Sequence, residues 1–560
     1  MHETAFHQNR SRNPIIICTI LAETSPQAVP LGAACIISAL RRSGFPAELR
    51  SFSAEDFQQD KSSCSSKIAA GLLAACSADE VPVIGFSLYV WNRLVLEETA
   101  RLIRKERPEA ILFAGGPEVT ALPEVIAKEN LFDYLITGEG EQTAVGLLTG
   151  LQESPGGISR GDLSPSPKSP SIKTKILAGI SSPSMEELSS PWLDGTLDPR
   201  DYGGALWELS RGCPFSCTYC YESKGERKVR HFPASRIEAE LDLFARAEIP
   251  QIFVLDPAFN ADKERALLIL ALIEQKLPDT HFCFEIRSEF LDKTLSEAFT
   301  HIPCSLQIGL QSADPEVLKN VGRNFNRKEF SRKIALLNEA GAVFGLDLIY
   351  GLPGDSLATF RSSLDYAIGL YPNHLDIFRL SVLPGTVLAA DAPRFGIDAE
   401  QSPPYHVKRT PKFSAADLTE AEKLAAACAL FYSAGRAVPW FLSVLHLLKM
   451  QPSRFLSDFA AWNRSRGTLP HKEIQKLQLQ FLKEKFREKK LSHLWTVTEE
   501  IILLHGAFSR AAGEGQEEIL DLSWHPEDLF MAQDIAAFAS EAYMEKTRVR
   551  IVAGPDMEIL

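Results

Sequence analysis

Two stretches of this 560-residue chain alternate short apolar segments with segments of helical period. The first covers residues 14–150, and the second runs from residue 201 to about residue 390. Such alternation favours parallel sheets, because two parallel strands need a crossover connection long enough to contain a helix. The sequence therefore predicts an α/β protein with two successive domains whose ligand-binding loops follow the carboxyl ends of the strands.

The first stretch predicts a doubly wound, Rossmann-like sheet with strands near 14–20, 47–52, 82–88, 110–114 and 133–137. No G-x-G-x-x-G sequence follows the first strand, which argues against a NAD-binding domain. The glycines in the loops after the strands would let the backbone approach a ligand closely. The candidate cofactor contacts in these loops are Thr24, Gly32, Ser87, Tyr89, Gly115, Gly116, Glu118, Gly138 and Glu139.

The second stretch predicts a (β/α)6 partial TIM barrel with strands near 205–210, 250–256, 281–287, 304–310, 343–350 and 375–382. Residues 151–200 begin with a run rich in Ser, Pro and Gly, and we expect them to be a linker. Beyond residue 400 the strand pattern fades. Residues 400–560 therefore predict a mostly helical third domain, to which the sequence assigns no role.

The net charge and the apolar runs of the sequence argue against two classes of protein, nucleic-acid-binding proteins and membrane-spanning proteins. The net charge is −13, so we expect no broad basic surface for nucleic acid. No apolar run reaches the roughly 18–20 residues of a membrane span, and the polar start of the chain does not resemble a signal peptide. We therefore expect a cytoplasmic protein. The seven cysteines outside residues 213–220 are scattered, which does not indicate a disulfide framework.

Three cysteines, Cys213, Cys217 and Cys220, occur with C-x3-C-x2-C spacing directly after the first expected barrel strand. Three thiolates on one loop suit an iron–sulfur cluster, and a four-iron cluster with three cysteine ligands keeps one iron open for a small chelating ligand. Two alternatives are buried structural cysteines and a zinc site. Zinc usually takes a fourth protein ligand, and no second Cys or His pair follows, although His231 is near in sequence.

This cysteine run, with the aromatic Tyr219 before its last cysteine, resembles the cluster loop of the radical S-adenosylmethionine (SAM) enzymes. The resemblance implies a [4Fe-4S] cluster whose open iron chelates the amino and carboxylate groups of SAM. Reductive cleavage would then give methionine and a 5′-deoxyadenosyl radical. It also implies an electron donor such as a flavodoxin or a ferredoxin.

SAM needs a partner for its methionine carboxylate and acceptors for its ribose hydroxyls. Arg287 suits the carboxylate, and Glu285 or Gln311 suits the ribose, in agreement with the order of such residues along the family's barrel. Ser312, Asp347 and Tyr219 complete the candidate contacts on this side. Alternatively, these polar groups fill the barrel core as hydrogen-bonded pairs, or Glu285 and Arg287 pair with each other.

The first domain resembles the cobalamin-binding domain that precedes many radical SAM barrels. S-L-Y at 87–89 and G-G at 115–116 stand where that family carries S-x-L and G-G. The first loop lacks the family's D-x-H, so no histidine of that loop would ligate cobalt, and we expect the benzimidazole base to lie inside the protein. The alternative is a nucleotide-type or vestigial Rossmann-like domain.

Together these features predict a cobalamin-dependent radical SAM enzyme that methylates an unactivated carbon of a small molecule. Radical cyclisation or rearrangement is one alternative, and a cobalamin- or redox-sensing binding protein is another. Two cofactors that serve one substrate must face each other. We therefore expect the carboxyl edge of the first sheet to pack over the barrel mouth, and the helical domain to close one side of the cavity or to meet a partner.

Overall fold

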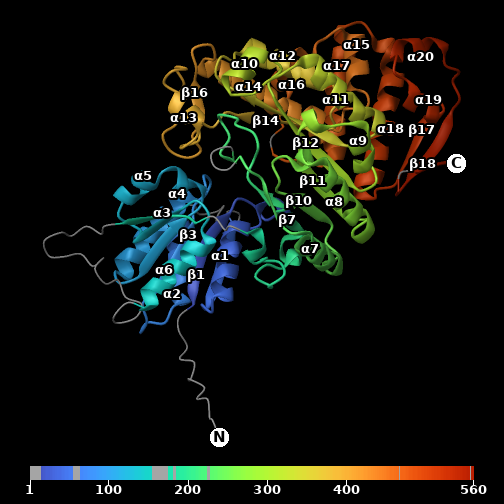
Figure 1. Cartoon of the computed structure of the whole chain (residues 1–560). Coiled ribbons are helices and arrows are strands. Elements are labelled where there is room, and N and C mark those ends of the chain that lie inside the picture. The colour runs from blue at the N-terminus through green and yellow to red at the C-terminus, as the bar shows by residue number, and fades with distance from the viewer. Residues whose placement is uncertain are drawn as a thin grey trace.

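The computed structural model describes residues 14–53, 63–153, 174–180, 184–222, 227–465, 467–554 and 556–560. The chain forms an α/β protein in which the N-terminal sheet, the barrel and the C-terminal helices follow one another in space as in sequence (Figure 1). None of the described helices is both long and apolar enough to cross a bilayer.

The N-terminal sheet is parallel and has the strand order β2-β1-β3-β4-β5-β6. The strand order reverses between β1 and β3, and ligands of open α/β sheets bind at such a switch point. Helices α1 and α6 pack against one face of the sheet, and α2, α3 and α5 pack against the other. The sheet is therefore doubly wound, as predicted. The strands are β1 (Ile15–Leu21), β2 (Ala47–Ser53), β3 (Val83–Ser87), β4 (Ile111–Gly115), β5 (Tyr134–Thr137) and β6 (Lys175–Ala178). The helices are α1 (Leu31–Arg42), α2 (Cys64–Ala74), α3 (Arg93–Glu106), α4 (Pro117–Ala121), α5 (Pro123–Lys128) and α6 (Glu141–Glu153).

The segment that we expected to be a linker is partly folded. Residues 154–173 lie outside the described residues, but β6 pairs in parallel with β5 at the edge of the sheet. The side chains of β6 are mostly exposed, so backbone pairing rather than an apolar pattern holds this strand. Further on, Trp192 and Leu197 are buried in the core of the barrel domain. The prediction of a linker over 151–200 is therefore wrong for these parts.

The second sheet is the predicted half-open barrel, with six parallel strands in the order β14-β13-β12-β11-β10-β7. Among the described residues, β7 and β14 do not pair with each other, so the barrel remains open on one side. The strands are β7 (Ala205–Trp207), β10 (Gln251–Val254), β11 (His281–Ile286), β12 (Cys304–Gln311), β13 (Phe344–Tyr350) and β14 (His374–Arg379). The surrounding helices are α7 (Ala234–Ala247), α8 (Lys263–Lys276), α9 (Lys293–Phe299), α10 (Pro315–Asn320), α11 (Arg327–Ala340) and α12 (Leu357–Ile368).

The C-terminal domain is mostly helical, as predicted, and also carries a small antiparallel sheet in the order β17-β18-β19. Its elements are α14 (Ala415–Cys428), the π-helical turn η9 (Ala429–Ala434), α15 (Phe441–Leu448), α16 (Pro452–Trp462), α17 (His471–Glu488), α18 (Trp495–Glu514), β17 (Glu518–Leu522), α19 (Pro526–Met531), α20 (Ile535–Glu541), β18 (Thr547–Val552) and β19 (Asp556–Ile559). The turn η9 lies against the free edge of β14. There the Ser433 hydroxyl accepts a hydrogen bond from the Leu375 amide (2.9 Å), and the Tyr432 hydroxyl donates to the Pro372 carbonyl (2.7 Å). The domain thus covers a strand edge that the open barrel exposes.

Hydrogen bonds from two tyrosines help to join the N-terminal domain to the rest of the chain. The segment between the barrel and α14 places Tyr405 against the N-terminal domain, where its hydroxyl donates to Glu118 (2.6 Å) and accepts from Arg93 (3.1 Å). In the cysteine loop, the Tyr221 hydroxyl donates to the carbonyl of Pro117 (3.2 Å), the first residue of α4. Loops at the carboxyl edge of the first sheet therefore touch the loop that carries the cysteines.

Candidate cofactor sites

The cysteine loop leaves the barrel between two short strands, β8 (Ser210–Arg211) and β9 (Arg230–His231), which pair antiparallel. Cys213 and Cys217 are buried, and Cys220 is half-buried. Backbone hydrogen bonds hold the loop from both sides, because Thr218 donates to Val321 O (3.1 Å) and accepts from the Leu388 amide (2.8 Å). The three thiols therefore belong to one anchored loop beyond the end of β7, as the spacing predicts.

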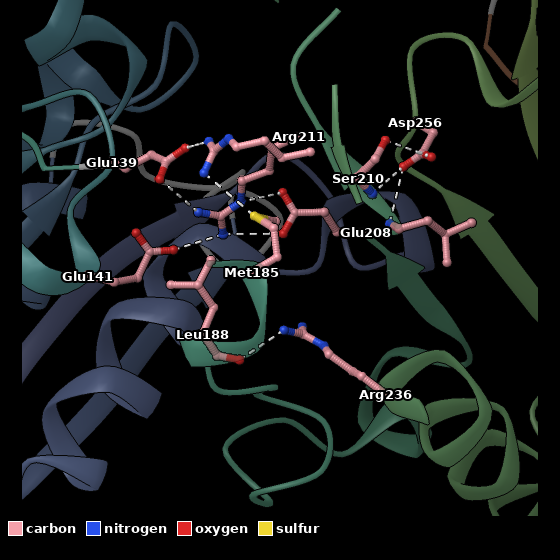
Figure 2. A network of polar contacts seen from close by, with 11 residues as sticks. Glu139, Glu141, Met185, Leu188, Glu208, Ser210, Arg211, Arg236 and Asp256 are labelled. Carbon is pink, nitrogen blue, oxygen red and sulfur yellow. Dashed lines mark hydrogen bonds and ion pairs between the residues drawn. The ribbon is translucent and has the colours of Figure 1, made fainter. Parts of the chain in front are cut away.

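Asp256, just after β10, fixes the strand that enters this loop. Its carboxylate accepts from the amides of Leu209 (3.1 Å) and Ser210 (3.0 Å) and from the Ser210 hydroxyl (2.9 Å; Figure 2). Burial raises the pKa of Asp256 to about 6, although these hydrogen bonds favour the charged form and oppose the shift. Asp256 is thus an anchor of the loop rather than an exposed ligand.

Arg287 stands beside the cysteines instead of facing the barrel lumen. Strand β11 ends at Ile286, and the Arg287 guanidinium stacks 3.8 Å from the Phe215 ring centroid and pairs with Glu289. Burial raises the pKa of the Cys213 thiol, and the positive charge of Arg287 acts in the opposite direction. A nearby cation favours the thiolate that iron requires. The alternative in which Arg287 pairs with Glu285 is not what the structure contains.

Within the described residues, no three Cys, His, Asp or Glu side chains converge in a way that could hold a single metal ion. A four-iron cluster takes each cysteine on a different iron, so its ligands need not converge on one point. The donor set of three thiols on one anchored loop fits such a cluster.

Gln311 has the features of a residue that awaits a polar ligand. It is buried in the left-handed region with φ 66°, and its Oε1 atom has no hydrogen-bond partner in the described part of the chain. A buried acceptor without a partner is costly, which fits a site that SAM would complete. Sequence reasoning missed the neighbouring Arg323, which donates to Gly309 O (2.7 Å) and to the Tyr219 hydroxyl (3.3 Å). Only the fold brings Arg323, shortly after the end of α10, to the cysteine loop.

Glu285 and Asp347 line a cavity of about 600 Å³ inside the barrel. Burial raises the pKa of Glu285 to about 7, and the negative charge of Asp347 adds to this shift. Burial also raises the pKa of Asp347 to about 6, although a hydrogen bond from Gln307 opposes it. Gln307 further donates to Asp376 (3.0 Å). Asp347 is therefore hydrogen-bonded within the lumen, as the alternative interpretation expected. Glu285 instead points its carboxyl into the cavity.

Ser312 lies away from this lumen. Its hydroxyl is 3.3 Å from that of Ser363 on α12 and accepts from the Asp314 amide (3.2 Å), which precedes α10. Ser312 therefore belongs to a group of hydrogen bonds at the N-terminal end of α10. The expectation of a direct cofactor contact gains no support from this position.

A second cavity, of about 230 Å³, lies at the carboxyl edge of the N-terminal sheet between α1 and α6. Seven of the candidate residues line it, namely Gly32, Ser87, Tyr89, Gly115, Gly116, Gly138 and Glu139. Its remaining walls are mainly apolar and are formed by Ile17, Ala33, Ile36, Phe86, Phe113, Ile136 and Ala144, with Glu141 and Arg211 at the polar side. The lining residues, all in the described chain, include no histidine.

Two candidates do not reach this cavity. Thr24 is exposed, and its hydroxyl donates to that of Ser53 (3.3 Å). Glu118 is buried in an ion pair with Arg93 (3.1 Å) and accepts from Tyr405. Glu118 thus joins two domains, because α4 turns its side chain away from the sheet edge. Both were expected to contact a cofactor, and the structure gives them other surroundings.

The glycines in the cavity wall meet different constraints. At Gly32 an added Cβ would lie 2.9 Å from the Tyr89 hydroxyl, whereas at Gly115 it would make only ordinary contacts, the nearest 3.5 Å from Ile136 O. Gly116 differs, because its φ is +103° and a Cβ there would lie 2.7 Å from Leu88 O. The protein's own backbone therefore requires glycine at 116. The apolar walls suit a planar aromatic group such as the benzimidazole base.

Comparison with known proteins agrees with this geometry. The model of the B12 binding domain matches residues 17–148, and that of the radical SAM superfamily matches residues 207–367. The chain is 28% identical over 334 residues to the cobalamin-dependent radical SAM methyltransferase TokK of Streptomyces tokunonensis, a match that covers 55% of this chain and 48% of TokK. It is also 28% identical, over 344 residues, to the 2-(S-pantetheinyl)-carbapenam-3-carboxylate methyltransferase of Streptantibioticus cattleyicolor, with the same coverage of 55% and 48%.

The chain thus spans about half the length of these curated relatives. Among solved structures, the cobalamin-dependent S-adenosylmethionine radical enzyme OxsB with aqua-cobalamin bound matches with a TM-score of 0.56 and 15% identity. That likeness concerns the fold, and it extends over 95% of this chain and 82% of OxsB. The chain therefore joins a B12 binding domain to a domain of the radical SAM superfamily, and its fold is that of a cobalamin-dependent radical SAM enzyme.

Proposed function

We propose that the protein is an enzyme that transfers a methyl group to an unactivated carbon of a small molecule. One observation carries this proposal. Arg211 lines the N-terminal cavity and lies only two residues before Cys213, so the two proposed cofactor sites would be neighbours. Such closeness is what a reaction with two cofactors and one substrate demands.

When bound, the cluster with SAM supplies a radical that abstracts hydrogen, and cobalamin supplies the methyl group. Cys213, Cys217 and Cys220 would hold the cluster as thiolates. Gln311 would donate to or accept from SAM through its amide, and Arg323 would keep Tyr219 in place beside the loop. An electron donor such as a flavodoxin or a ferredoxin would complete the system.

The lumen would hold the substrate next to SAM. Its walls, which include Glu285, Asp347 and Asp376, would orient the substrate through hydrogen bonds and exclude bulk water. The N-terminal cavity would take the benzimidazole end of cobalamin between Phe86, Phe113 and Ile136. Methyl transfer is supported by the two relatives at 28% identity, which are both methyltransferases.

Anaerobic purification followed by cofactor extraction tests the proposal. We expect corrin together with about four iron and four sulfide per chain. Incubation with SAM and a reductant should then give both 5′-deoxyadenosine and S-adenosylhomocysteine, since the second product records loss of the methyl group.

Formation of 5′-deoxyadenosine alone from corrin-loaded protein would favour cyclisation or rearrangement over methylation. Protein that takes up iron but no corrin would contradict the cobalamin assignment. Protein that takes up corrin but forms no cluster would instead favour the sensing alternative.

A further inference from the structure

A network of ion pairs connects the base of the cysteine loop to the N-terminal cavity. Strands β8 and β9 close the loop at its base, and one of their two cross-strand pairs is Arg211 opposite Arg230. Arg211 faces Glu141, the first residue of α6 (Figure 2), and Arg230 pairs with Glu139 in the loop between β5 and α6. The network therefore joins the two ends of the cysteine loop to one segment of the other domain.

Arg211 is the centre of this network. Its Nη2 atom lies 2.8 Å from Glu141 Oε1, its Nε atom 3.0 Å from Glu208 Oε1, and its Nη1 atom 3.7 Å from Glu139 Oε2. Arg230 pairs with Glu139 as well. The Arg211 and Glu141 side chains are only 15% and 10% exposed, so water screens their attraction weakly.

The same side chains form part of the cavity wall. Glu139, Glu141 and Arg211 all line it, and Glu141 is the first residue of α6. A ligand in the cavity would displace water from these ion pairs and lower the local dielectric, which strengthens them. A strengthened network would hold β8, and hence Cys213, more firmly in place.

We propose that Arg211 is a positioning residue through which the two cofactor sites communicate, so that cobalamin in the cavity and the cluster on the loop each raise the affinity for the other. This inference rests on the proposed function, because it requires both cofactors to bind. Backbone hydrogen bonds and Asp256 already anchor the loop, and a cluster would restrict Cys213 and β8 further, which lessens the ordering that cobalamin binding would otherwise impose. Coupling between two binding sites is reciprocal, which makes it measurable from either side.

The chain offers well-matched variants. Glu141→Gln removes one carboxylate but leaves Arg211 paired with Glu208. Arg211→Lys keeps the positive charge but loses the planar fork that bridges two carboxylates. Tyr405→Phe is the control, because it removes hydrogen bonds to Arg93 and Glu118 between the same domain and the rest of the chain without touching the network.

The experiment measures the Kd of hydroxocobalamin by anaerobic equilibrium dialysis, for the 560-residue chain with its cluster reconstituted and with its iron removed by a chelator. We expect the wild-type protein to bind roughly five- to a hundredfold more tightly with the cluster. In Glu141→Gln and Arg211→Lys this ratio should fall towards one, and in Tyr405→Phe it should stay as in the wild type. A thermal unfolding curve of each variant serves as the control that the variant is folded.

The outcomes are distinguishable. Equal Kd values for the two wild-type forms would overturn the inference alone. A wild-type ratio that both network variants preserve would show that another path carries the coupling, and it would also overturn it. Absence of hydroxocobalamin binding in both forms would overturn the proposed function together with the inference. A merely structural role of Arg211 would change Kd equally in both forms and leave the ratio unaltered.

Discussion

The two cavities of this protein are built by different means. The N-terminal cavity is walled by apolar side chains and by glycine backbone, and its charged groups are engaged with one another at one side. The barrel lumen also has apolar walls, but it carries several acidic side chains, among them Glu285, Asp347 and Asp376. The first can recognise a ligand by shape and the second by charge and hydrogen bonds. Substitutions should therefore act through volume in the first and through protonation in the second.

The largest effect should come from the cysteine loop. Replacing Cys213, Cys217 and Cys220 together by Ala should abolish the cluster and all SAM cleavage, because no other thiol lies on this loop. Cobalamin binding should persist at reduced affinity. Iron analysis and 5′-deoxyadenosine formation measure the loss, and a variant that retains iron-dependent absorbance would contradict the assignment.

Volume should dominate in the N-terminal cavity. Gly115→Trp should weaken hydroxocobalamin binding roughly ten- to a hundredfold, the equivalent of about 1–3 kcal/mol for an extra side chain forced into a filled space. Gly115→Ala is the matched control, since its Cβ would make only ordinary contacts, and its Kd should change little. Equal effects of Ala and Trp would show that position 115 does not face the ligand. Gly116 is a poor probe, because any side chain there strains the backbone.

Protonation should dominate in the lumen. The pKa of Glu285 is raised to about 7 in the folded protein, against about 4.3 for an unperturbed Glu. Between these two values the folded state binds the proton and the unfolded state does not, so this group makes stability fall as pH rises. Because the lumen admits water, we expect an effect of less than ~1 kcal/mol.

Glu285→Gln removes this titration. Urea unfolding at pH 5 and pH 8, without cofactors, should show a smaller loss of stability with rising pH in the variant than in the wild type. Identical pH profiles would contradict the raised pKa of this carboxyl. Asp347, whose pKa is about 6, titrates in the same direction, and because its charge acts on Glu285, the difference between the two profiles includes the interaction of this pair.

The smallest effect should come from a residue that belongs to neither cavity. Thr24→Ala removes only an exposed hydrogen bond to Ser53, so we expect stability to change by less than about 0.5 kcal/mol and hydroxocobalamin affinity to stay constant. Parallel denaturant and dialysis measurements test both. A marked loss of affinity would show that Thr24 contacts cobalamin, as the sequence predicted.

Local sequence determined much of this molecule. The alternation of apolar and helical segments predicted both parallel sheets and the position of the cysteine loop after the first barrel strand, because this signal depends on residues that are neighbours in the chain. Seven of the nine N-terminal candidates line one cavity, since strand ends of a parallel sheet meet at one edge whatever the details of packing.

Tertiary structure decided the rest. Glu118 joins Tyr405, which is 287 positions away, Arg323 reaches Tyr219 over 104 positions, and Arg211 meets Glu141 over 70. No spacing rule encodes such pairs, because the partner of a buried charge is set by how whole domains pack. Strand β6 is a similar case, since its exposed side chains carry no pattern and its backbone pairs only because β5 offers a free edge.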